Sequence, residues 1–93
     1  MPIYQITPLG EAEALHALLD ARLPNEDIIE LPLGTFLVAY PGRMRELITK
    51  LGLESLPGRP APTQAFVTQI TAYAGFGPAE LWDWCANACK RTA

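Results

Sequence analysis

The sequence predicts an α+β fold of the ferredoxin-like β-α-β-β-α-β type, an antiparallel sheet with two helices on one face and an appended C-terminal helix. Runs rich in Ile, Val, Thr and aromatic residues alternate with runs whose apolar residues recur at helical spacing. Proline and glycine separate these runs. The length of 93 residues predicts a single domain, 1–93. A three-layer arrangement stays open as an alternative.

The first strand and helix follow from residue type and spacing. Residues 2–7, PIYQIT, are rich in β-favouring side chains and predict a strand. Thr7 and Pro8 then predict an N-cap and a first helical position. This helix is expected to end near residue 23, because Pro24 disfavours helical geometry in the residue before it. Its apolar stripe comprises Ala14, Leu15, Leu18 and Leu19.

A hairpin follows. Residues 27–31 and 35–40 predict two strands, joined by the short connection Pro32-Leu33-Gly34. The second of them contains the continuous apolar run FLVAY, which indicates a strand covered on both faces. In the predicted topology the first and third strands are therefore central.

The remaining elements are a helix, a loop, a strand and a last helix. Residues 42–51 predict an amphipathic helix that stops at Gly52. Three prolines within residues 53–63 indicate a loop, and residues 64–73 predict the fourth strand. Pro78 opens a final helix that is expected to extend to residue 91.

Composition excludes several classes of function. Ten acidic residues against seven Lys and Arg give a net charge of −3, which disfavours nucleic-acid binding. The N-terminal residues lack the pattern of a secretory signal, and no apolar run approaches the roughly 20 residues of a membrane helix. Two cysteines in such a chain indicate free thiols in a reducing compartment. We therefore expect a cytoplasmic protein that does not contact a membrane.

The stretch WDWCANACK places two tryptophans and two cysteines on the last helix. Cys85 and Cys89 fall on its apolar side, and we interpret them as buried packing residues that dock the helix onto the sheet or onto a second subunit. A zinc site needs four ligands, and a redox pair is usually Cys-x-x-Cys, so no metal or cofactor is expected. Trp82 falls nearer the apolar arc than Trp84, and both are candidate interface residues.

Two groups of polar residues have the composition of a possible site. His16 lies one helical turn from Glu13 and from Asp20, on a predicted solvated face, which is typical of a surface charge ladder rather than of a catalytic group. No catalytic residue is predicted. Arg43 and Arg45 stand near the start of the second helix and are candidate anion-binding residues.

The order of IYQIT, GTFLVAY, MRELITKL and AFVTQITAYAGFGPAELWDW resembles the superfamily of small CRISPR-associated endoribonucleases and virulence-associated protein D. The resemblance implies a ferredoxin-like fold and homodimers formed through sheet edges and C-terminal segments. Nuclease members of that superfamily carry a metal-binding acidic residue at the end of the first strand. Here that strand ends Gln5-Ile6-Thr7-Pro8, without a carboxylate, so no catalytic residue is carried over.

These observations favour a small noncatalytic protein-interaction or regulatory domain, expected to be a homodimer and to bind a protein partner. Two alternatives stay open: a metal-dependent nuclease of the resembled superfamily, and a small phage-type inhibitor that acts by binding a protein.

Overall fold

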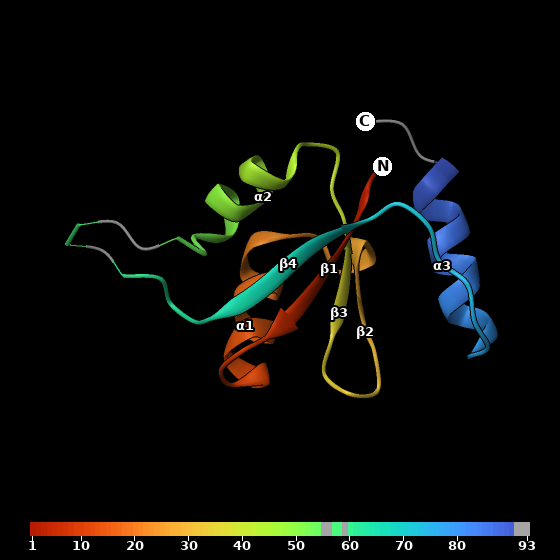
Figure 1. The fold of residues 1–93 in the computed structure, drawn as a ribbon, viewed down its shortest axis with the longest axis horizontal. Coiled ribbons are helices and arrows are strands. Elements are labelled where there is room, and N and C mark those ends of the chain that lie inside the picture. The colour runs from red at the N-terminus through yellow and green to blue at the C-terminus, as the bar shows by residue number, and fades with distance from the viewer. Residues whose placement is uncertain (55–56, 59, 91–93) are drawn as a thin grey trace.

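The computed structural model of the chain describes residues 1–54, 57–58 and 60–90. Within this part of the chain, four strands and three α-helices alternate along the sequence (Figure 1). They are β1 (Ile3–Pro8), α1 (Ala12–Arg22), the 3₁₀ turn η1 (Asn25–Asp27), β2 (Ile28–Glu30), β3 (Phe36–Ala39), α2 (Met44–Leu51), β4 (Ala65–Ile70) and α3 (Ala79–Lys90). The predicted α+β class is confirmed.

The four strands form one sheet in the order β2-β3-β1-β4, and all neighbours are antiparallel. The prediction that the first and third strands are central is therefore confirmed. Ile3 lies opposite Ala39 of β3 on one side and opposite Ile70 of β4 on the other. The edges of the sheet are the three-residue β2 and the six-residue β4.

The two faces of the sheet are covered by different helices. Because side chains alternate along a strand, β1 directs Tyr4 and Ile6 to one face and Ile3 to the other. The first face packs against α1 and α2 through buried leucines, namely Leu15, Leu19, Leu47 and Leu51. This cluster is the main hydrophobic core.

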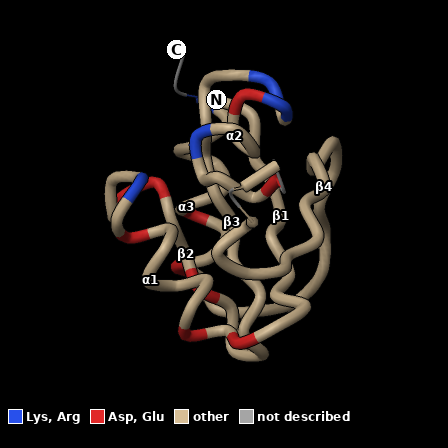
Figure 2. Tube along the Cα trace, turned by 90° about the vertical axis from the view of Figure 1, so that its left-hand side faces the viewer, with Lys and Arg blue, Asp and Glu red and all other residues tan. Residues whose placement is uncertain are grey.

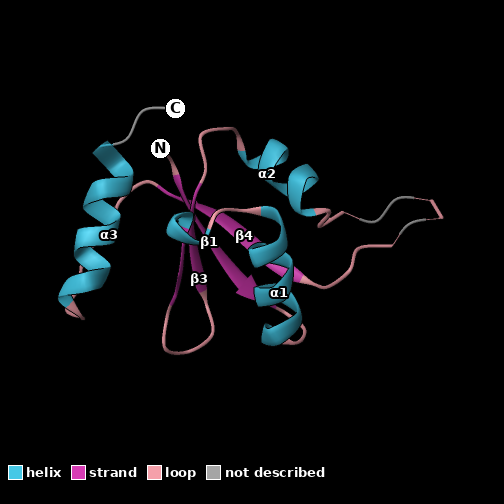
Figure 3. Cartoon of the chain, turned by 180° about the vertical axis from the view of Figure 1, so that it is seen from behind, coloured by secondary structure: helices cyan, strands magenta, loops and turns pink. Residues whose placement is uncertain are grey.

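Helix α3 lies on the opposite face of the sheet (Figure 3). Cys85 and Ala88 are buried against Ile3, Leu37 and Ala39. The N-terminal ammonium group of Met1 donates to the carbonyl oxygen of Ala88 at 2.8 Å, which ties the start of the chain to the end of α3. The layers are thus helices, sheet and helix, the arrangement that the sequence left open as an alternative.

Some predicted boundaries are wrong. β1 continues through Pro8, which lies opposite Ala65 of β4, so Thr7 and Pro8 belong to a strand and do not start a helix. The residue before α1 is Glu11, and its side chain makes no capping hydrogen bond. β4 ends at Ile70 rather than at residue 73, and Arg91, the last residue of the predicted final helix, lies outside the described residues.

Two glycines have the backbone geometry that their predicted turns require. Gly34, with φ of 89°, closes the connection between β2 and β3, where the N–H of Leu31 donates to the oxygen of Thr35 at 2.7 Å. Gly52, with φ of 70°, ends α2 in the left-handed region. Both turns are confirmed.

Among the described residues, every helix is too short or too polar to cross a membrane.

Candidate protein-binding groove

Helix α3 covers only part of its face of the sheet, and a groove remains between the helix, the sheet and two loops. Two adjoining hollows, of about 240 and 480 Å³, make up this groove. We call it the α3 groove and define it by the residues that line both hollows: Gln5, Leu31, Ala74, Leu81 and Trp82. Its floor is sheet, and its walls come from the turn 31–35, the segment 73–78 and α3.

Local sequence fixes the wall formed by residues 73–78. The Trp82 indole N–H donates to the carbonyl oxygen of Gly77 at 3.2 Å, and the Trp82 ring stacks on Tyr73 with ring centroids 6.3 Å apart. A Cβ on Gly75 or Gly77 would lie 3.6–3.7 Å from the Trp82 ring, at ordinary van der Waals distance, so the backbone of this segment runs beside the indole.

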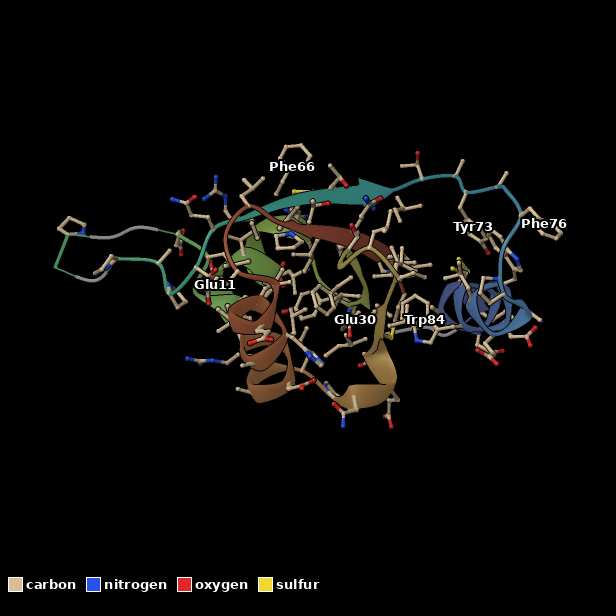
Figure 4. The ribbon with its side chains drawn as sticks, turned by 90° about the horizontal axis from the view of Figure 1, so that it is seen from below. Glu11, Glu30, Phe66, Tyr73, Phe76 and Trp84 are labelled. Atoms are coloured by element: carbon tan, nitrogen blue, oxygen red, sulfur yellow. The ribbon has the colours of Figure 1, made fainter. Side chains whose placement is uncertain are left out.

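Two apolar side chains at the mouth of the groove are fully solvated. Leu33, in the turn between β2 and β3, is 97% exposed, and Phe76, in the segment before α3, is 104% exposed. Figure 4 shows Phe76 pointing outward at the same end of the molecule as Tyr73. Exposed apolar side chains beside a hollow are typical of an interaction surface.

The groove carries no charge. None of the described residues that line either hollow is Asp, Glu, Lys or Arg. Charges lie elsewhere: in Figure 2 Lys and Arg positions lie around α2 and at one end of α1, and Asp and Glu positions lie both beside them and over the lower part of the molecule. The lining therefore offers a ligand only shape, apolar contact and neutral hydrogen bonds.

The uncharged surface continues from the groove across the sheet. Gln5 lies opposite Thr68 of β4, and Thr7 lies opposite Phe66, which is 58% exposed. Strand β4, AFVTQI, contains neither a charged residue nor a proline, although both commonly protect edge strands. The open sheet face and this edge extend the uncharged surface of the groove.

The two candidate interface tryptophans have different positions. Trp82 lines the groove, whereas Trp84 packs on the sheet cluster beneath α3, where its indole N–H donates to the carbonyl oxygen of Glu26 at 3.0 Å. Trp84 therefore joins α3 to the 3₁₀ turn η1. The structure assigns the two residues to different surfaces.

The prediction that both cysteines are buried holds for Cys85 and is wrong for Cys89. Cys85 is buried at the inner end of the groove, and Cys89 is exposed. The reason is that Ala88 takes the position facing the sheet in the last turn of α3. Burial, followed by the neighbouring Cys89, raises the pKa of the Cys85 thiol. Burial and the nearby Cys89 and Cys85 likewise raise the pKa of the Tyr73 hydroxyl.

Arg43 and Arg45 are exposed at the start of α2. Arg43, but not Arg45, lines an open hollow of about 440 Å³, which also contains the carboxylate-bearing side chain of Glu46. The buried Tyr4 hydroxyl donates to the carbonyl oxygen of Gly42 beside it, at 2.8 Å. The structure thus does not bring the two arginines together around one hollow.

His16 lies on the exposed face of α1, as predicted, with its Nε2 3.3 Å from a carboxylate oxygen of Asp20. Its ring centroid is 5.5 Å from that of the buried Phe36, so the imidazole partly covers the core. Within the described residues, no three His, Cys, Asp or Glu side chains lie close enough together to hold a metal ion.

Sequence reasoning missed the residues that form the mouth of the groove. Their signal is the occurrence of large apolar residues in turns, where polar residues are usual: Leu33 stands between Pro32 and Gly34, and Phe76 between Gly75 and Gly77.

No protein-family model, curated protein or solved structure matches the chain.

Proposed function

We propose that this protein is a small noncatalytic interaction domain that binds protein through the α3 groove. The observation that carries the proposal is the pair Leu33 and Phe76, two large apolar side chains held in solvent on the rim of an uncharged hollow. Burying one such side chain stabilises a complex by about 1.5–3 kcal/mol. Inhibition of another protein by covering its surface, as a phage-type inhibitor does, is one form of this function.

Two finer proposals accompany it. The antiparallel order β2-β3-β1-β4, with α1 and α2 on one face, supports assignment to the ferredoxin-like fold. The two free cysteines support a cytoplasmic location. A metal-dependent nuclease is the alternative, and it lacks a supporting observation because β1 carries no carboxylate.

Site-specific photocrosslinking tests the proposal. A benzophenone amino acid at position 33 or 76 should form adducts with protein in an extract of the source cells. The same group at position 14, exposed on α1 on the other side of the sheet, is the control and should form none above background. A protein captured at the groove must then bind the purified wild type and lose that binding to Phe76→Asp. Adducts equal at positions 14 and 76, or none at positions 33 and 76, would contradict the proposal.

A further inference from the structure

We infer that the open edge of β4 binds an extended segment of another protein as a fifth strand, and that this segment alternates acidic residues with apolar ones. Residues 65–69, which form most of this edge, do not line the α3 groove, so the edge is a second surface. Its ligand is specified by the direction of the β4 backbone groups, by the exposed Phe66 and by the charge of α2.

Every second residue of β4 directs its backbone N–H and C=O away from β1. The Leu9 N–H donates to the carbonyl oxygen of Gln64 at 3.0 Å, so β1 and β4 are hydrogen-bonded at this pair and at each second pair after it. The residues between these pairs, whose N–H and C=O point to the open edge, are Ala65, Val67 and Gln69. Among the described residues, these groups have no hydrogen-bond partner. A chain that bonds to them must be extended, as an added strand is.

The two sides of an added strand would meet different surroundings. Phe66 lies on the α3 side of the sheet and is 58% exposed, and Figure 4 shows it on the outer side of β4, directed away from α1. A residue of the added strand on that side gains apolar contact with the Phe66 ring. Ala65 and Val67 lie on the other side, where they pack against the core beneath α1 and α2. Residues of the added strand on this second side therefore lie next to α2, which contacts β4.

Helix α2 presents positive charge beside this edge. Its exposed basic residues are Arg43, Arg45 and Lys50, and among the described residues none of the three forms an ion pair. Arg43 lines the same open hollow as Gln69, at the end of β4. The acidic side chains of this region have partners nearby: Glu46 lies against Gly42, and Glu54 accepts from the Thr49 hydroxyl at 3.3 Å. An added strand with Asp or Glu on the α2 side is therefore the complementary ligand.

The same charge disfavours a second copy of this chain. If two copies joined β4 to β4 in antiparallel order, their α2 helices would lie on one face and bring their arginines toward each other. Strand β4 itself has no acidic residue to offset that repulsion. The edge is thus protected against its own copy and open to an acidic strand.

Selection from a displayed library of short random peptides tests the inference. Peptides enriched on the full chain should alternate Asp or Glu with apolar residues. In a nuclear magnetic resonance titration, the most enriched peptide should slow amide hydrogen exchange at residues 65, 67 and 69 and leave the indole resonance of Trp82 unchanged. Arg43→Glu should weaken its binding about 5-fold, whereas Lys90→Glu, on α3, should bind as the wild type.

Two further measurements examine the backbone contacts. Gln69→Pro removes an outward N–H without removing a bond to β1, so it should weaken binding about 10-fold or more, and the control Gln69→Ala should not. Should Gln69→Pro fail to fold, N-methylation of alternate peptide residues gives the same information, since only the N–H groups that face β4 are needed. No enriched peptide, or an equal effect of N-methylation at both sets of residues, would overturn the inference. Protection of residues 65–69 that rises with protein concentration without peptide would show that a second copy covers the edge, and would overturn it as well.

Discussion

Replacement of Trp84 by alanine should destabilise the protein more than replacement of Trp82. Trp84 packs on the sheet cluster beneath α3, and its N–H bonds to the Glu26 oxygen at 3.0 Å. Trp82 instead packs on Tyr73 and on the segment before α3. Removal of a fully buried tryptophan costs about 3–5 kcal/mol. Because Trp84 is half-buried and its hydrogen bond is near solvent, we expect Trp84→Ala to cost about 2 kcal/mol and Trp82→Ala about 1 kcal/mol.

Urea denaturation followed by circular dichroism measures both values. A loss of about 2 kcal/mol should lower the urea midpoint by about 1 M in a domain of this size. Trp84→Phe keeps most of the packing and removes the N–H donor, so it should cost about 0.5–1 kcal/mol. If Trp82→Ala is the more harmful change, or if Trp84→Ala has the stability of the wild type, α3 does not dock on the sheet through Trp84.

Three further predictions concern the cysteines, the pH dependence of stability and Gly52. Cys85→Ala should lower the free energy of unfolding by about 1 kcal/mol, and Cys89→Ala should leave it nearly unchanged. In the native protein a thiol reagent should label Cys89 quickly and Cys85 slowly, and in denaturant it should label both at the same rate. Burial raises the pKa of the Cys85 thiol and of the Tyr4 hydroxyl. As pH rises, the unfolded chain therefore loses these protons before the folded protein does. The free energy of unfolding should then fall as pH rises past about 9. That fall should be smaller in Cys85→Ala combined with Tyr4→Phe; an equal slope in a pH series of urea melts would contradict the assignment. Gly52→Ala should lower the free energy of unfolding, measured by thermal denaturation, by about 1 kcal/mol, because φ at this position is 70°. The control Gly10→Ala, at a position without a positive φ, should lower it by less. Equal losses in the two variants would show that backbone strain at Gly52 is not the cause.

The fold was predictable where local signals were strong. The continuous apolar run of β3 marked a central strand, and all four of its residues are buried. Helix α2 combined clear periodicity with a glycine stop, and it ends at the predicted residue. The start of α1 was wrong because pairing of Pro8 with Ala65 extends β1, a tertiary effect that competes with the capping signal of Thr7-Pro8.

The candidate site was much less predictable. The α3 groove draws its lining from four separate parts of the chain, namely β1, residues 31–37, residues 70–78 and α3, which come together only when α3 docks on the sheet. Helical spacing placed Cys85 on the apolar side of α3, but it could not show how far the sheet extends beneath the last turn, where Cys89 is exposed. Spacing also could not show that Trp82 packs on a loop and Trp84 on the sheet.

Substitutions at Leu33 and Phe76 can test the proposed binding without changing the fold. At 97% and 104% exposure these side chains bury almost no area against their own chain, so they contribute little to the stability of a monomer. Neither side chain is needed to form its turn, because the positive φ values fall on the neighbouring Gly34 and Gly75. Exposed apolar side chains favour nonspecific association, and that cost is offset only when a partner covers them. Substitutions at these two positions are therefore expected to leave the folding of the monomer unchanged and to test the proposed binding by itself, whereas substitutions at Trp84 are expected to change the docking of α3.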